Sequence, residues 1–309
     1  MFKAFRWKSD YRQTVQLLCN NHDEETISPH SYMWNITGTD PLGQLLWIFL
    51  KTLGDNTRDL QYARDYQPQR EDVSQLRVML YGPVGAGKSS FINSVSTTLR
   101  GRMSAGAMTG TVQSVEGQSL TKKVLKNCEL HSHFVFNDIM GIEDGSGRGV
   151  HVNDIKLAMM GNVMENHKFN PVSPLSSGDP GYNQSPSPDD RIHVLVCILS
   201  ANASEIQDSV LQKMRDVREA ANDLGIPQLL IVTKVDEACP ETQKSLRNVY
   251  RSKHVKKKVK FSSKVGIPMN FILPVKNYSE EISTNPDVDT LILSILRLII
   301  DFGDDFLEK

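Results

Sequence analysis

Cysteine and net charge are both scarce in this chain, and each scarcity argues against a class of protein. The four cysteines, Cys19, Cys128, Cys197 and Cys239, are far apart and form no CxxC pair. Their spacing argues against a disulfide framework or a cysteine-bound metal and favours reduced thiols in the cytosol. The formal net charge is -1, so the chain as a whole sets up no field that would attract nucleic acid or an anionic membrane.

Long apolar runs are also missing. Residues 42–53 and 291–300 form the longest such runs, and both fall short of the ~20 residues that cross a bilayer. The first six residues include charged side chains and lead into no apolar segment, which argues against secretion. We therefore expect a cytoplasmic protein with no membrane partner.

Residues 1–72 are mostly polar and irregular, and we interpret them as an N-terminal extension. Within them, residues 42–53 repeat apolar side chains at helical spacing, which predicts an amphipathic helix. A helix that packs onto the main domain is favoured over one that lies on a membrane surface.

From residue 73 to residue 309, apolar runs alternate with amphipathic stretches. This pattern predicts strands at residues 76–81, 120–125, 133–137, 193–199, 228–233 and 270–273, and helices at residues 88–99, 154–160, 205–224, 242–250 and 287–307. Residues 165–190 are rich in Pro, Ser, Gly and Asn and predict a long loop. The alternation predicts one three-layer α/β domain, with a mostly parallel sheet that helices cover on both faces.

The strongest functional pattern is a complete phosphate-binding loop, GxxxxGK(S/T), at residues 82–89. It follows a predicted strand and opens a predicted helix, so backbone N–H groups and the helix N-terminus would face phosphate oxygens. Lys88 would bridge the β- and γ-phosphates, and the Ser89 hydroxyl would bind Mg²⁺. The residues expected to contact the phosphates are Gly82, Val84, Gly85, Ala86, Gly87, Lys88, Ser89 and Ser90.

A second pattern predicts which base is bound. Residues 233–236 read Thr-Lys-Val-Asp and end a predicted strand, as in the Asn-Lys-x-Asp sequence of GTPases. The Asp236 carboxylate can accept hydrogen bonds from N1–H and the exocyclic amine of guanine, whereas adenine offers no such pair of donors. Thr233 would lie beside it, and the stem of Lys234 would lie along the base. After the last strand, a backbone N–H of Val275 or Lys276 would contact guanine O6.

A third pattern, DxxG, ends the strand predicted at residues 133–137. Asp138 would reach Mg²⁺ through a water molecule, and the Gly141 N–H would contact the γ-phosphate. A switch loop at residues 102–111 would supply a threonine to the metal. Thr111 and Thr109 both fit that role.

Together these patterns resemble a regulatory GTPase domain. Residues 72–95, 137–143 and 274–279 are more specifically similar to the interferon-induced protein 44 family, including its 44-like member. The resemblance covers roughly residues 68–309. It implies a cytosolic GTP-binding protein that is induced by interferon and has antiviral or antiproliferative roles. Longer members carry a larger N-terminal domain, which residues 1–67 are too short to supply.

Two residues depart from a Ras-like GTPase. Val84 stands where a glycine usually lies near the γ-phosphate, and Ile142 stands where a glutamine orients the attacking water. The sequence identifies no catalytic residue, and we expect slow GTP hydrolysis. The alternative is a nucleotide-locked interaction module with little turnover, whereas Asp236 and the DxxG pattern argue against an ATPase or kinase. A protein partner is expected but not specified, and a homodimer across the nucleotide face is left open.

Residues 251–260, together with Lys264, form the one dense basic run. A solvated helix end is favoured over a contact with an anionic membrane or RNA. Aromatic residues are not interleaved within the run, which argues against stacking on single-stranded nucleic acid.

Overall fold

The computed structural model describes residues 56–309, apart from residues 105–125, 130–132, 140, 146–147, 166, 204 and 251, and for residues 126–129 it describes the backbone alone. Three predictions lie outside the described residues. They are the helix at 42–53, the strand at 120–125 and the choice between Thr109 and Thr111.

Within the described residues, a six-stranded sheet forms the centre of the fold, with the strand order β2-β3-β1-β4-β5-β6. The strands are β1 (Leu76–Tyr81), β2 (Lys126–Glu129), β3 (Phe134–Asp138), β4 (Val194–Ser200), β5 (Gln228–Thr233) and β6 (Ile272–Pro274). Among these six strands, β2 alone runs antiparallel, to its neighbour β3. Apolar residues occupy both faces of β1, β4 and β5 and are almost all buried, as expected for parallel strands covered on two sides.

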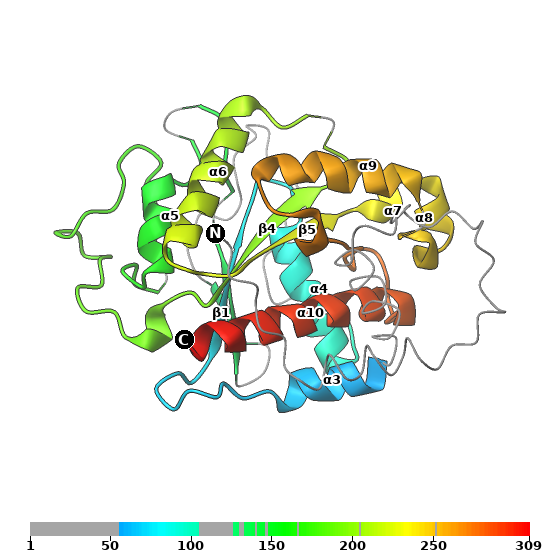
Figure 1. Ribbon diagram of the computed structural model, residues 1–309, viewed down its shortest axis with the longest axis horizontal. Coiled ribbons are helices and arrows are strands. Elements are labelled where there is room, and N and C mark those ends of the chain that lie inside the picture. The colour runs from blue at the N-terminus through cyan, green and yellow to red at the C-terminus, as the bar shows by residue number, and fades with distance from the viewer. Residues whose placement is uncertain are drawn as a thin grey trace.

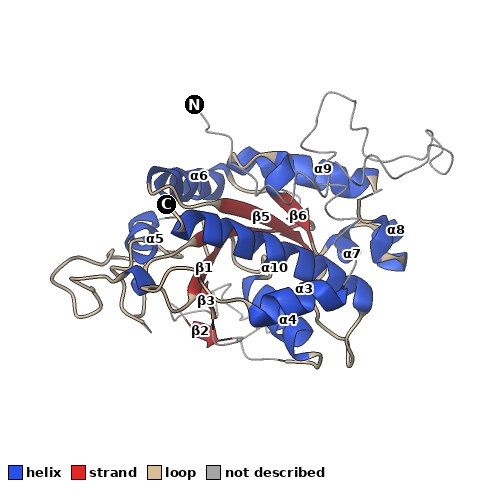
Figure 2. Cartoon of the chain, turned by 60° about the horizontal axis from the view of Figure 1, so that its bottom comes forward, coloured by secondary structure: helices blue, strands red, loops and turns tan. Residues whose placement is uncertain are grey.

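Helices cover both faces of the sheet, which confirms the predicted three-layer α/β architecture (Figures 1 and 2). One face carries α4 (Lys88–Arg100) and α10 (Pro286–Leu307), with α3 (Asn56–Asp65) packed against α10. The other carries α5 (Val152–Met159), α6 (Asp208–Asp223) and α9 (Lys253–Ser262). Two short helices, α7 (Val235–Ala238) and α8 (Pro240–Lys244), follow β5, and short 3-10 turns lie at Pro188–Asp190, Leu246–Asn248, Ser263–Val265 and Met269–Phe271.

The helix predicted at residues 242–250 is wrong in its bounds. Helix α8 begins earlier, with Pro240 at its first position, where a proline fits because no N–H donor is needed there. It ends at Lys244, since Ser245 is extended (φ −156°, ψ 119°) and a 3-10 turn, Leu246–Asn248, follows. The apolar spacing of residues 242–250 therefore predicts helical turns correctly, but it does not predict the break between them at Ser245.

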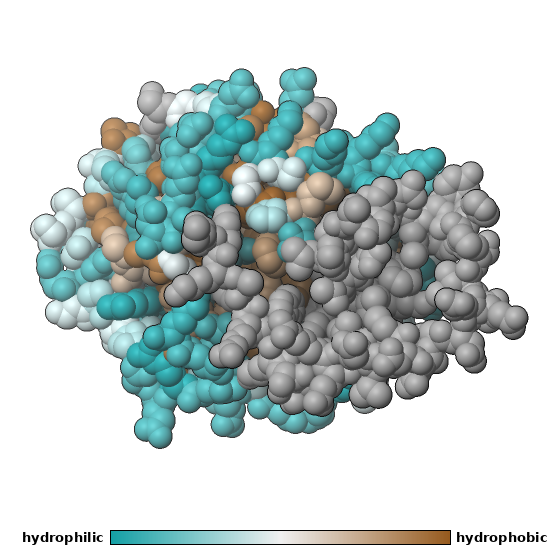
Figure 3. Space-filling model, in the orientation of Figure 1, coloured by the Kyte–Doolittle hydropathy of each residue, from teal (hydrophilic) through white to brown (hydrophobic). Residues whose placement is uncertain are grey.

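The basic run forms a complete helix, α9, and not merely a helix end. The hydroxyl of Ser252 accepts from the amides of His254 and Val255, which caps the helix start. Val255 and Val259 are buried, while Lys257 and Lys260 are exposed. Side chains over α6 and α9, at the top of Figure 3, are mainly hydrophilic. No helix in the described part of the chain is long and apolar enough for a membrane crossing.

Helix α3 shares the core of the domain. The ring of Tyr66 stacks on Phe134 with 4.9 Å between centroids, and its hydroxyl donates to Asp304 Oδ1 at 2.6 Å. Two turns earlier, the carboxylate of Asp59 is fully buried and accepts from Arg297 Nη1 at 2.7 Å. These contacts join residues 56–66 to α10, which lies within the predicted domain of residues 73–309. The predicted boundary between residues 72 and 73 stays a prediction.

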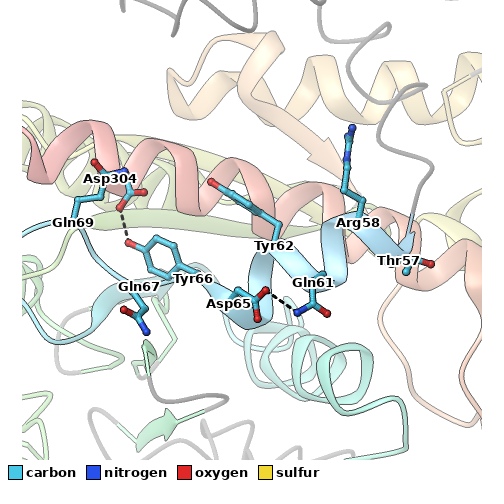
Figure 4. A pocket seen from close by; sticks show the side chains of 9 residues that line it. All are labelled: Thr57, Arg58, Gln61, Tyr62, Asp65, Tyr66, Gln67, Gln69 and Asp304. Carbon is cyan, nitrogen blue, oxygen red and sulfur yellow. Dashed lines mark hydrogen bonds between the residues drawn. The ribbon is translucent and has the colours of Figure 1, made fainter.

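An open hollow lies along α3, and Figure 4 shows the side chains around it. It is lined by Thr57, Arg58, Gln61, Tyr62, Asp65, Tyr66, Gln67, Gln69 and Asp304. Some of its polar groups already bond to one another, as Gln61 Nε2 does to Asp65 at 2.7 Å. None of the site residues predicted from the sequence lines this hollow.

We expect Arg297→Met to lower the free energy of unfolding by about 3 kcal/mol, because it leaves the buried Asp59 carboxylate without its main partner. Arg247→Met is the matched control, since Arg247 pairs with Asp287 at 3.2 Å but is 82% exposed. That loss should stay below about 1 kcal/mol. Denaturant unfolding of both variants measures the difference, and equal losses would contradict a structural role for the α3–α10 ion pair.

Candidate nucleotide-binding site

The sequence patterns meet at one edge of the sheet. Strands β1, β3, β5 and β6 run parallel in register, so their carboxyl ends, Tyr81, Asp138, Thr233 and Pro274, lie at the same edge. The phosphate loop follows the first of them, the DxxG segment the second, and the predicted base-binding segments the other two. Ligands of open α/β folds bind outside the carboxyl ends of the strands, which is where the structure gathers these residues.

The phosphate loop depends on backbone conformations that favour glycine. Gly82, Gly85 and Gly87 have φ values of 146°, 73° and 96°. A Cβ on Gly82 would lie 2.1 Å from the carbonyl oxygen of Ile198, so the loop approaches β4 too closely for any side chain there. Lys88, Ser89 and Ser90 then open α4, whose N-cap, Gly87, provides no side-chain cap. The first N–H groups of α4 are therefore open to an acceptor from outside the helix.

Two side chains from the base-binding segments hold the phosphate loop. The buried hydroxyl of Thr233 donates to the carbonyl oxygen of Ala86 at 2.6 Å, and Asn277 Nδ2 donates to that of Gly87 at 3.2 Å. Both side chains lie close to Gly87, where a Cβ would be 3.1 Å from Asn277 Nδ2 and 3.3 Å from Thr233 Oγ1. Asn277 is not among the site residues predicted from the sequence, and only its position next to Lys276 could have suggested it.

Three polar side chains lie together beneath the loop. Lys88 Nζ donates to the carbonyl oxygens of Gly82 and Pro83, each at 3.0 Å. The hydroxyl of Ser89 donates to Oδ2 of Asp138. The other carboxylate oxygen, Asp138 Oδ1, is buried and has no hydrogen-bond partner within the described part of the chain.

Burial acts on both charged groups of this cluster. It lowers the pKa of Lys88, an effect that the nearby Asp138 charge partly offsets. It raises the pKa of Asp138, an effect that Lys88 and the hydrogen bond from Ser89 partly offset. An anion beside Lys88 and a cation beside Asp138 would relieve both penalties. Carboxylate and hydroxyl oxygens are the hard ligands that Mg²⁺ prefers, so Ser89 and Asp138 fit that ion.

The DxxG glycine packs directly on the phosphate loop. A Cβ on Gly141 would lie 2.5 Å from Val84 Cγ2 and 2.8 Å from its amide nitrogen. The next residue, Ile142, donates its N–H to the carbonyl oxygen of Gly82 at 3.1 Å, and its side chain is 2% exposed. An aliphatic side chain is thus buried at the position where a Ras-like protein would orient water.

The segment after Ile142 is fastened to α6. Lys213 Nζ donates to the carbonyl oxygens of Glu143, at 2.8 Å, and Gly145, at 3.2 Å. The hydroxyl of Ser209 donates to the carboxylate of Asp144. No motif pointed to Lys213 or Ser209, because these contacts depend on how α6 packs and not on local sequence.

The Thr-Lys-Val-Asp segment turns sharply after β5. Lys234 has φ 57° and ψ 35°, the one non-glycine residue with positive φ in the described part of the chain. Such a conformation costs about 1–3 kcal/mol and often occurs at functional sites. It begins α7 and places Asp236, whose side chain is 19% exposed, in the first turn of that helix.

The segment after β6 lies beside Asp236. The amide of Val275 donates to the carbonyl oxygen of Val232 at 2.8 Å. This N–H is one of the two expected to contact guanine O6, and it already takes part in the hydrogen bonding of the sheet. Lys276 Nζ lies 3.5 Å from Asp236 Oδ2 and 2.7 Å from Glu281 Oε1. The structure therefore brings a carboxylate and an ammonium group together on the predicted base side.

The strand order, the antiparallel edge strand β2 and the phosphate loop between β1 and α4 define a P-loop GTPase fold. Interferon-induced protein 44-like from Homo sapiens is 33% identical over 263 residues, which is 84% of this chain and 58% of the relative. Interferon-induced protein 44 from Mus musculus is 32% identical over 253 residues, 81% of this chain and 60% of the relative. The chain belongs to the interferon-induced protein 44 family, as its motifs predicted, and spans about three-fifths of the length of these relatives.

No family model matches the chain. Among solved structures, Toc33 from Arabidopsis thaliana in complex with GDP and Mg²⁺ aligns with a TM-score of 0.48 and 13% identity, over 83% of this chain and 96% of that one. A variant of Era from Aquifex aeolicus aligns with a TM-score of 0.34 and 16% identity, over 66% of this chain and 52% of that one. These scores are too low to add to the fold assignment, which rests on the strand order and the phosphate loop.

We expect Gly141→Ala to lower the free energy of unfolding by ~1–3 kcal/mol, because the new methyl group would force the DxxG segment away from Val84. Gly178→Ala is the control, since a Cβ there meets no atom within 4 Å. Thermal or denaturant unfolding measures both variants. An unchanged stability in Gly141→Ala would contradict the close packing of the two loops.

Proposed function

We propose that this chain binds GTP and GDP together with Mg²⁺ and that it hydrolyses GTP slowly. One observation carries the proposal. A buried lysine, a serine hydroxyl and a carboxylate with an unpartnered oxygen lie together at the uncapped start of α4, directly after a phosphate-loop sequence.

The phosphate half of the site would work through charge and backbone geometry. The open N–H groups of α4 and the loop would cradle phosphate oxygens, and Lys88 would exchange two loop carbonyls for the β- and γ-phosphates. Ser89 and Asp138 would hold Mg²⁺, the latter directly or through water. When bound, Mg²⁺ neutralises negative charge on the phosphates.

The residues on the base side of the site favour binding of guanine over binding of adenine. Asp236 is partly buried at the edge of the sheet and can accept from both N–H donors of guanine. Adenine would leave the carboxylate without those donors, which is costly at a partly buried position. Thr233 and Asn277 connect this half to the phosphate loop, so base binding and phosphate binding share one rigid support.

The residues on the γ-phosphate side of the site favour slow hydrolysis of GTP. Val84 faces Gly141, and the side chain of Ile142 is buried, so neither of these residues can place an attacking water. This favours a second candidate function, an interaction module that holds its nucleotide and scarcely turns it over. A fast reaction would need a group from a protein partner or from a second copy across the nucleotide face.

The cellular setting rests on the family. We infer from the names of the relatives that interferon raises the expression of this protein. An antiviral role in innate immunity and a cytoplasmic location remain part of the same proposal.

We expect Asp236→Asn to weaken GTP binding by on the order of 100-fold, because two hydrogen bonds to a charged acceptor are lost. The same variant should gain affinity for xanthosine triphosphate, whose additional oxygen needs a donor that the asparagine amide supplies. Glu237→Gln is the matched control at the neighbouring exposed position, and it should change neither affinity. Calorimetric titrations measure all three proteins, and an unchanged preference in Asp236→Asn would contradict the assigned base contact.

Turnover gives a separate test. We expect single-turnover hydrolysis of GTP by the isolated monomer at about 10⁻⁴ s⁻¹ or below, the intrinsic scale of Ras-like proteins, because neither Val84 nor Ile142 can place the water. Any faster rate should rise with protein concentration or on addition of a partner. Fast hydrolysis that does not depend on concentration would show that the chain carries a catalytic residue of its own.

A further inference from the structure

An ion-pair cluster lies on the base side of the site, beyond the contacts that the sequence patterns predict. Lys276 Nζ lies between two carboxylates, 3.5 Å from Asp236 Oδ2 and 2.7 Å from Glu281 Oε1. The three side chains are 25%, 19% and 24% exposed, so each is shielded from water but reachable. A base that binds Asp236 must therefore come close to the ammonium group of Lys276.

Glu281 fixes the position of this ammonium group. Its second oxygen, Oε2, accepts from the amides of Ser279, at 2.8 Å, and Glu280, at 3.2 Å. One oxygen is thus held by the backbone while the other holds Lys276. Burial lowers the pKa of Lys276, but the hydrogen bond to Glu281 and the charge of Asp236 outweigh it, so its pKa is raised and the group stays charged.

Of the two backbone N–H groups expected to contact O6, that of Val275 is already hydrogen-bonded. The Val275 N–H donates to the Val232 carbonyl oxygen at 2.8 Å and extends the ladder between β5 and β6. An incoming base would have to break this bond to use that donor. The Lys276 ammonium, by contrast, carries three protons and needs to give up only its longer contact with Asp236.

On a guanine base, the carbonyl oxygen O6 is adjacent to N1–H along the same edge. If N1–H meets Asp236 Oδ2, the oxygen beside Lys276, and the exocyclic amine meets Oδ1, then the ammonium group of Lys276 would face O6. We propose that the Lys276 side chain, held in place by Glu281, donates a hydrogen bond to O6 of the guanine base, while Asp236 accepts from N1–H and the exocyclic amine. This inference rests on the proposed binding of guanine nucleotides and names a specificity residue within that site.

The arrangement would also reject adenine actively. Adenine carries an amine at the position of O6, and this donor would meet an ammonium group that has no acceptor to offer. Discrimination would then come from an unfavourable contact at Lys276 as well as from the lost pairing at Asp236. In this account Glu281 is a positioning residue, since it acts through Lys276 and not on the base.

A double comparison of variants and nucleotides tests the proposal. The probes are GTP, 6-thio-GTP, whose sulfur at position 6 is a weaker acceptor while N1–H and the amine are kept, and ITP, which keeps O6 but lacks the amine. We expect the wild type to prefer GTP over 6-thio-GTP by about tenfold, and Lys276→Met to lose about tenfold in GTP affinity together with that preference. The ratio of GTP to ITP affinity, which reports on Asp236, should stay the same.

Two further variants complete the design. Glu281→Gln keeps Lys276 and should reduce the preference for GTP over 6-thio-GTP only in part, because its single amide oxygen cannot both hold the ammonium group and accept from the amides of Ser279 and Glu280, so Lys276 is held less firmly but is still present. Lys244→Met removes an exposed lysine from α8 and should leave every affinity as it is. Thermal unfolding of each variant confirms that it is folded.

Four outcomes would contradict this account, and each has a different meaning. Tighter GTP binding by Lys276→Met would mean that its ion pair only competes with the base. Equal losses for GTP and 6-thio-GTP would mean that Lys276 acts through general charge and does not contact O6. A wild type that binds none of the three nucleotides would overturn the proposed function itself, whereas GTP binding with no preference at position 6 would overturn this inference alone.

Discussion

The burial of two opposite charges side by side, Lys88 and Asp138, is the constraint on which the site depends. Each group is charged in water. Burial lowers the pKa of Lys88 and raises that of Asp138, and both shifts favour the neutral form. The fold keeps them buried together because β1 and β3 are adjacent parallel strands and α4 begins directly above their ends. Such a penalty lowers stability in the empty site, and in the proposed function the phosphates and Mg²⁺ would supply the opposite charge to each group.

The rest of the domain holds that cluster rigid. Gly82 lies against β4, Gly141 lies against Val84, and Thr233 and Asn277 bond to the carbonyl oxygens of the loop. Each contact involves a different strand or the segment that follows it, so the sheet register sets the geometry of the loop. Helix α6 reaches the same region through Lys213, which connects the segment after the DxxG glycine to the opposite face of the sheet from α4.

The sequence predicted the parts of this site that depend on local backbone chemistry. Glycine spacing located the phosphate loop, and apolar runs located the strands that carry Asp138 and Thr233, because both signals lie within a few residues. Asn277, Lys213 and Glu281 could not be found in this way. Their roles depend on contacts such as the one between Asn277 and Gly87, which are 190 residues apart in the chain. The break at Ser245 was missed for a related reason, since apolar spacing does not report a single extended residue.

Competition between nucleotides for the wild-type protein tests the central claim most directly. A fluorescent guanine nucleotide would be bound in the presence of Mg²⁺ and displaced by unlabelled GTP, GDP or ATP. The account predicts that GTP and GDP displace the probe at least about 100-fold more effectively than ATP, because the Asp236 carboxylate finds donors only on guanine. Equal displacement by GTP and ATP, or failure of the probe to bind, would contradict it.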